Sequence, residues 1–314
     1  MLRARFVAGA IVAAFISSGL CGTQAQALNV VASIKPVHSI TAALMQGAGG
    51  PQLIIGGVAS PHATALKPSQ AAALANADLV VWVGPQIETF LHDPLEALAD
   101  KARILTLSQV PGLVRLPLRE GGLFEPHEDA AHDADGHAQN EAEFDGHLWL
   151  DPLNARAMAE AIAAALGEAD PRNAALYRDN LARLKQALDA LSEETAQAMA
   201  DLKAGRFIVF HDAYQYFEAR FGVAARGAIT INPDVTPGAQ RIGEIRRKVA
   251  AQAIDCVFTE PQFSPKIVSA IVDGMQVRTA ILDPLGADID EGPQQYPALI
   301  RAIAASFRQC LAPR

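Results

Sequence analysis

Residues 170–205 have the sequence DPRNAALYRDNLARLKQALDALSEETAQAMADLKAG, and their pattern predicts one long helix. Asp170 and Pro171 form a helix start, because aspartate caps a first turn and proline fits its first position. Gly205 marks the end. Apolar or small side chains recur every three or four residues in one stripe: Tyr177, Leu181, Leu184, Leu188, Leu191, Thr195, Ala198 and Leu202. At 1.5 Å per residue the helix is roughly 46 Å long, enough to run along two lobes and fix their relative position.

Strand-like and helix-like segments alternate on both sides of this helix. Before it, apolar runs predict strands at 29–34, 52–55, 79–83 and 103–107, with helices at 37–46, 86–98 and 152–166. After it, strands are predicted at 206–210, 223–229, 255–259 and 277–282, with helices at 213–220, 236–253, 265–272 and 294–311. Alternation with short connections is typical of parallel α/β sheets. The halves share this element order but no sequence repeat.

We therefore predict an α/β fold of two lobes with parallel sheets flanked by helices, joined by one long rigid linking helix. The predicted boundaries are 1–27 for a signal peptide, 28–169 for an N-terminal lobe, 170–204 for the linking helix and 205–314 for a C-terminal lobe. The N-terminal lobe includes a loop at 125–145.

The first 27 residues have the pattern of a secretory signal. Arg3 and Arg5 precede an apolar run that ends at Leu20, and Ala25-Gln26-Ala27 fits a signal-peptidase site. The run is shorter than the roughly 20 residues that span a bilayer, so we expect no membrane anchor after cleavage. Cys21 leaves a lipoprotein as an alternative, although Leu20 fits a lipobox poorly. The chain carries 34 acidic and 26 basic residues, and this negative balance disfavours nucleic acid as a partner.

Two cysteines, Cys256 and Cys310, follow the predicted leader. An even pair in an exported protein indicates a disulfide, and closing a loop of this length stabilises by about 4 kcal/mol. Two buried free thiols are the alternative.

Residues 125–152 combine four histidines with nine carboxylates and no lysine or arginine. Up to Asp145 the histidines recur every five residues among small and acidic residues, which follows no helical face and predicts an accessory, metal-attracting loop: His127, His132 and His137. His147 differs from them, because it begins the apolar run HLWL and lies next to the helix start Asp151-Pro152. We expect His147 in ordered structure.

Ligands of parallel sheets bind outside the carboxyl ends of the strands. His211 and Asp283 each follow directly on an apolar strand, and His62 and His147 lie on loops that border the first sheet. If the lobes face each other, these four side chains converge on one cleft, and three imidazoles with one carboxylate suit Zn²⁺. A single strand-end histidine is more often a hydrogen-bonded structural group. His38 and His92 lie in helical segments, and we interpret both as structural.

Seven segments together resemble the zinc-binding periplasmic component of bacterial ABC importers: LNVVASIKPVHSI, NADLVVWVGP, DGHLWLDP, VFHDAYQYFE, INPDVTPGAQR, CVFTEPQFSP and ILDPLG. This family of metal receptors has two α/β lobes on a rigid linking helix, and the resemblance covers essentially the whole chain after the leader. Its three histidine ligands correspond to His62, His147 and His211, and the carboxylate ligand of some members corresponds to Asp283. Many members have a glutamate before the first histidine. Here that residue is Pro61, which leaves Asp283 or water as the fourth ligand.

The resemblance implies a periplasmic, monomeric receptor that captures Zn²⁺ between its lobes and delivers it to a membrane permease with a cytoplasmic ATPase. No catalysis is expected. A manganese receptor of the same family is one alternative, although an imidazole at His211 favours zinc. An exported zinc hydrolase is another, because three histidines and a water also describe a catalytic site. Glu260, after a predicted strand, would then be the nearest general base.

Overall fold

The computed structural model describes residues 27–62, 65–121, 123–124, 144–230 and 237–312. The predicted leader, apart from Ala27, and the accessory histidines His127, His132 and His137 lie outside these residues. No helix in the described parts of the chain is both long and apolar enough to cross a membrane.

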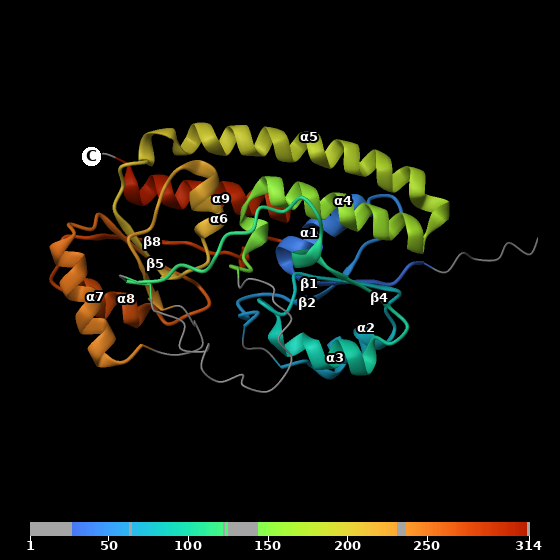
Figure 1. Cartoon of the computed structure of the whole chain (residues 1–314), viewed down its shortest axis with the longest axis horizontal. Coiled ribbons are helices and arrows are strands. Elements are labelled where there is room, and N and C mark those ends of the chain that lie inside the picture. Colours follow the sequence, from blue (N-terminus) through green and yellow to red (C-terminus); the bar gives the residue numbers. More distant parts are fainter. Residues whose placement is uncertain (1–26, 63–64, 122, 125–143, 231–236, 313–314) are drawn as a thin grey trace, which may run out of the picture.

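Two four-stranded parallel sheets confirm the predicted α/β class (Figure 1). The first has the order β2-β1-β3-β4, and the second repeats it as β6-β5-β7-β8. The strands of the first sheet are β1 (Val30–Ile34), β2 (Gln52–Ile55), β3 (Leu79–Trp82) and β4 (Arg103–Thr106). Those of the second are β5 (Phe207–His211), β6 (Ala228–Thr230), β7 (Cys256–Thr259) and β8 (Arg278–Ile281).

Equivalent aspartates begin the third strand of each sheet. Asp78 accepts a hydrogen bond from the backbone N–H of Asn29 at 2.8 Å, and Asp255 accepts one from that of Arg206 at 3.1 Å. The two halves are thus built alike in three dimensions, although their sequences show only a common order of elements.

The helices flank both sheets and match most of the predicted segments. They are α1 (Lys35–Leu44), α2 (Pro68–Ala75), α3 (His92–Leu98), α4 (Pro152–Ala169), α5 (Ala174–Met199), α6 (Gln215–Phe221), α7 (Ala239–Ala251), α8 (Pro265–Val272) and α9 (Gln295–Leu311). The helix predicted at 86–98 is shorter than expected. Pro94 has no N–H and must stand in a first turn, so α3 begins only at His92, after a 3₁₀ turn at Thr89–Leu91. The strand predicted at 223–229 is likewise reduced to β6.

Helix α5 forms most of the predicted linking helix and runs beside both sheets (Figure 1). It packs on α4 and α1 on the side of the first sheet and on α9 and α6 on the side of the second. Asn180 in α5 is buried and donates to the carbonyls of Leu44 at 2.6 Å and Gln46 at 2.9 Å, at the C-terminal end of α1. One hydrophobic core continues from β1 past α5 to the second sheet, where Phe207, Phe258 and Phe307 pack together. The predicted domain boundaries remain a prediction.

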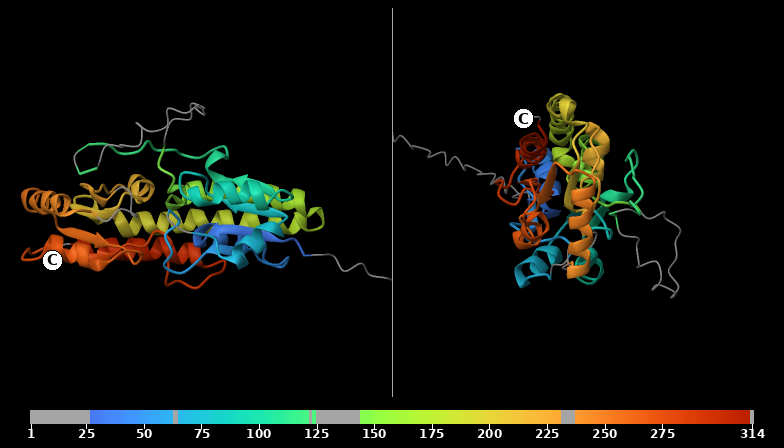
Figure 2. Two further views of the ribbon diagram at one scale, coloured as in Figure 1. Left: turned by 90° about the horizontal axis from the view of Figure 1, so that it is seen from below. Right: turned by 90° about the vertical axis from the view of Figure 1, so that its left-hand side faces the viewer.

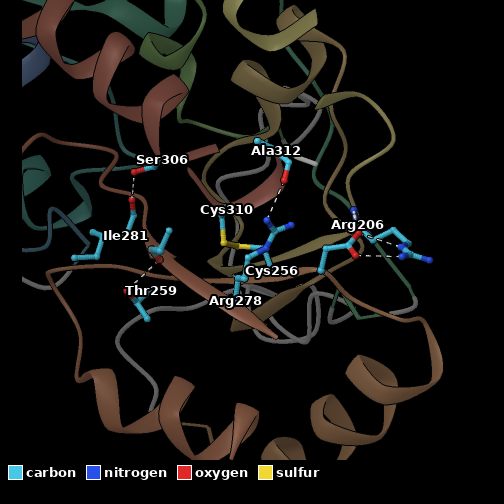
Figure 3. The surroundings of a disulfide bond; sticks show 10 residues. Arg206, Cys256, Thr259, Arg278, Ile281, Ser306, Cys310 and Ala312 are labelled. Carbon is cyan, nitrogen blue, oxygen red and sulfur yellow. Dashed lines mark hydrogen bonds and ion pairs between the residues drawn. A yellow bond between two sulfur atoms is a disulfide. The ribbon is translucent and has the colours of Figure 1, made fainter. Parts of the chain in front are cut away.

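A disulfide joins Cys256, the first residue of β7, to Cys310 in the last turn of α9 (Figure 3). Their Cα atoms are 5.8 Å apart and both residues are buried. The predicted pairing is confirmed, and the alternative of two free thiols is wrong. The bond ties the final helix to the second sheet.

Candidate metal centre

Three histidines from distant parts of the chain meet between the two sheets. His62 lies in the loop after β2, His147 precedes the 3₁₀ turn at Leu148–Leu150, and His211 is the last residue of β5. One ring nitrogen of each lies within 4.8 Å of those of the other two. The Nε2 atoms of His147 and His211 are 3.3 Å apart. The three histidines line one cavity of about 10 Å³, which is room for a single ion or water.

Carboxylates hold two of these rings from behind. The Nδ1 of His147 is 2.7 Å from Asp145 Oδ1, and that of His211 is 2.8 Å from both carboxylate oxygens of Glu260. A ring that donates through Nδ1 keeps Nε2 as a lone-pair donor, and such a partner fixes the ring orientation and strengthens the ligand. Since the two Nε2 atoms lie 3.3 Å apart and both rings line the cavity, the arrangement is suited to binding a cation.

Burial and neighbouring charges give the three rings different proton affinities. Burial, followed by the charges of His147 and His211, lowers the pKa of His62 well below its usual value. Burial, with His211 beside it, does the same to the pKa of His147. Burial is also the largest single influence on the pKa of His211 and lowers it, but the charge and hydrogen bond of Glu260, with the charges of Asp212 and Asp145, together raise this pKa. His211 is therefore the most readily protonated of the three rings.

The family model of ZnuA, the periplasmic component A of zinc-uptake complexes, matches residues 30–310. The high-affinity zinc uptake system protein ZnuA of Brucella abortus (strain 2308) is 45% identical over 332 residues, covering 99% of this chain and 98% of that protein. The protein of the same name from Yersinia pestis is 36% identical over 289 residues, covering 90% and 91%. This chain belongs to the ZnuA family.

Solved structures agree with this assignment. A crystal structure of ZnuA matches with a TM-score of 0.76 at 26% identity, covering 91% of this chain and 100% of that one. The laminin-binding protein Lmb of Streptococcus agalactiae, a bifunctional protein with adhesin and metal-transporting activity, matches with a TM-score of 0.73 at 26% identity, covering 90% and 99%. The fold of two lobes with parallel sheets is therefore that of the ZnuA family.

Asp283, the fourth ligand candidate of the sequence, is not among the residues that meet in this group. Its Oδ1 accepts from Gln262 Nε2 at 2.9 Å and from the N–H of Leu285 at 3.0 Å, and its Oδ2 accepts from the N–H of Ala287 at 2.5 Å. Gln262 itself lines the cavity, and its Oε1 is buried with no hydrogen-bond partner within the described residues. A ligand role for Asp283 remains a prediction, because here its carboxylate supports the turn after β8 and holds Gln262.

The two histidines interpreted as structural lie apart from this group. The Nε2 of His38 is 3.1 Å from the carbonyl oxygen of Pro51, and His92 is exposed on α3 beside Asp93. Sequence reasoning missed Asp145 and Gln262, and it considered Glu260 only as a general base. Asp145 could have been found from its place two residues before His147. Glu260 directly follows β7, and His211 ends β5. Because β5 and β7 are neighbours in the sheet, a contact between the two residues could have been considered.

We expect zinc binding to release protons in the unmodified protein, chiefly from His211. The pKa of His211 is raised, so this ring is protonated at pH values where His62 and His147, with lowered pKa values, are already neutral. Since only a neutral imidazole binds metal, zinc affinity should fall as pH drops through the pKa of His211. Titration calorimetry at one pH in buffers of different ionisation enthalpy measures the released protons.

Glu260→Gln is the matched variant, because it removes the charge that raises the pKa of His211 and keeps the shape of the side chain. Proton release at the same pH should then decrease, although Asp212 and Asp145 remain beside His211. Equal proton release in both proteins would contradict the assignment of this proton to His211.

Proposed function

We propose that this chain is a periplasmic receptor that captures Zn²⁺ between its two lobes and delivers it to a membrane permease for uptake. The observation that carries the proposal is the meeting of three imidazoles, two of them with Nδ1 held on buried carboxylates and with their Nε2 atoms 3.3 Å apart. Three nitrogen ligands with one further position suit zinc. The names of the relatives, zinc uptake proteins, agree with this cargo.

A manganese receptor of the same fold is the first alternative. Mn²⁺ prefers carboxylate and water oxygens, whereas imidazole suits zinc. The described group offers three ring nitrogens, and the nearby carboxylates Asp145 and Glu260 face the Nδ1 atoms of two histidines. This donor set favours zinc.

A zinc hydrolase is the second alternative, and it requires a general base beside a metal-bound water. Glu260 was the candidate for that base. Both of its oxygens are 2.8 Å from the Nδ1 of His211, so the residue is committed to holding a ligand. This contact favours a binding protein over an enzyme, and we assign the chain no catalytic residue.

The proposed role comprises capture of zinc and its delivery. The leader predicted at 1–27 would place the receptor in the periplasm, where the loaded protein docks on an ABC permease that its cytoplasmic ATPase drives. His62, His147 and His211 are the proposed ligands. His127, His132 and His137 would serve as accessory zinc contacts outside this centre.

Competitive titration of the purified chain with Zn²⁺ and Mn²⁺ tests the proposal. We expect one tight zinc equivalent that excess Mn²⁺ does not displace, because the three imidazoles favour zinc. Removing the leader before purification leaves the proposed ligands unchanged. Tight manganese binding, or no zinc binding at all, would overturn the proposed cargo.

The fourth position around the metal gives a separate prediction. We propose that water occupies it and donates a hydrogen bond to Gln262 Oε1, which has no partner in the part of the chain that the structure describes. Asp283→Asn should then weaken zinc binding less than tenfold, because an amide oxygen can still accept from Gln262. Removal of a direct ligand should weaken zinc binding by more than the 10- to 100-fold loss that is typical of outer-shell partners.

Zinc titrations of Asp283→Asn and Gln262→Met measure both effects, and X-ray absorption of the zinc-loaded protein counts the oxygen neighbours. Gln262→Met keeps the length of the side chain and removes the acceptor, so we expect roughly tenfold weaker binding. A loss well beyond 100-fold in Asp283→Asn would make Asp283 the fourth ligand instead.

A further inference from the structure

One isolated antiparallel β-bridge joins the chain on the two sides of the acid- and histidine-rich stretch. Pro117 pairs with Phe144, and the N–H of Asp145 donates to the carbonyl of Leu116 at 2.9 Å. Asp145 is also the residue whose carboxylate contacts the ring and the N–H of His147. The bridge therefore fixes the backbone of Asp145, and the carboxylate of Asp145 orients the ring of His147.

Tyr216 of helix α6, in the second lobe, forms hydrogen bonds to both segments that this bridge joins. Its hydroxyl accepts a hydrogen bond from the N–H of Leu116 at 3.0 Å and donates one to the carbonyl of Asp145 at 2.7 Å. Tyr216 is buried. The neighbouring Gln215 donates to the carbonyl of Pro117 at 3.0 Å.

The chain continues from the bridge over the second lobe (Figure 2). We call this segment, residues 115–121 and 123–124, the strap. The guanidinium of Arg119 in the strap bonds Asp212 and contacts Glu218 at 2.6 Å, and it stacks over the ring of Phe124 at 4.3 Å. Asp212 directly follows His211, and the Glu218 carboxylate is buried. Leu123 packs into the smaller core of the second lobe. The strap is thus anchored next to the other proposed ligand.

We infer that Tyr216 is a positioning residue for His147, acting across the lobes through Asp145. His147 lies on the segment that leads into α4 beside the first sheet, whereas Tyr216 belongs to the helix that follows β5. One hydroxyl therefore couples the contact between the lobes to the orientation of a metal ligand. This inference rests on the proposed function, because it assigns Tyr216 to the same zinc centre.

Tyr216→Phe tests the inference against a purely structural role. It should weaken zinc binding about tenfold, the lower end of the range for outer-shell partners, because Asp145 loses the contact that fixes its backbone. Tyr177→Phe is the matched control. Tyr177 is equally buried and also bonds through its hydroxyl, to Asp170 at 3.1 Å, but on α5 away from the cavity.

We expect both variants to unfold at a lower temperature than the unmodified protein, and only Tyr216→Phe to lose zinc affinity in calorimetric titrations. Cobalt(II) in place of zinc gives a second readout, since its visible absorption follows ligand geometry. That spectrum should change in Tyr216→Phe and stay unchanged in Tyr177→Phe. Equal zinc affinities and equal cobalt spectra in the two variants would overturn the inference.

A double-mutant cycle with Asp145→Ala tests the route through Asp145. If Tyr216 acts through that carboxylate, Tyr216→Phe has little further effect once the carboxylate is gone, and the two losses are not additive. Independent, additive losses would contradict the route. Failure of the unmodified protein to bind zinc would instead refute the proposed function, so the two failures are distinguishable.

Discussion

His211→Ala should weaken zinc binding by more than about 100-fold, which corresponds to about 3 kcal/mol or more of binding free energy. The substitution removes one of three nitrogen ligands, and it leaves the buried carboxylate of Glu260 without the ring that it holds. The loss of a direct ligand should exceed the loss expected for an outer-shell partner. Competition against a chelator of known zinc affinity measures the change.

His38→Ala is the control for this substitution. His38 is buried and its Nε2 is 3.1 Å from the carbonyl oxygen of Pro51, but it is not part of the histidine group. Its replacement should reduce the thermal stability and leave zinc affinity within about twofold, since no proposed ligand or outer-shell partner is touched. Zinc affinity that is indifferent to His211→Ala would refute the proposed ligand set, whatever the stability of the variant.

Replacing both Cys256 and Cys310 by serine should lower the free energy of unfolding by about 4 kcal/mol. The disulfide closes a loop with a sequence separation of 54 residues, and its loss restores that freedom to the unfolded chain. For a chain of this size the melting temperature should fall by roughly 10 °C. Thermal unfolding followed by circular dichroism measures the shift.

Reduction of the unmodified protein provides the comparison, because it opens the same bond without changing the sequence. The serine variant and the reduced protein should melt close together. Zinc affinity well below the melting temperature should change little, because both cysteines lie away from the residues that line the cavity. An unchanged melting temperature in both preparations would contradict a stabilising role for the bond.

Most secondary structure followed from local patterns. The apolar stripe of α5 is buried at Leu184, Leu188 and Leu191, as the spacing of these residues predicted. The segments 52–55 and 265–272 coincide with β2 and α8. The exceptions have local causes that the hydrophobic pattern does not include. In α3, Pro94 delays the start of the helix.

The sequence by itself determined the kind of chemistry. It placed histidines at strand ends and on bordering loops, and because parallel strands end at one edge, their convergence between two similar lobes could be expected. It also contained the cysteine pair and the resemblance to zinc receptors. These features depend on residue type and on local order along the chain.

Only the tertiary structure decided which groups serve the centre and how. The pairing of His211 with Glu260 joins positions 49 residues apart, because β5 and β7 are neighbours in the sheet. Asp283 follows its strand as predicted, but the N–H groups of the next turn and Gln262 bond its carboxylate. Strand order and hydrogen-bond competition are non-local properties, and no spacing along the chain specifies them.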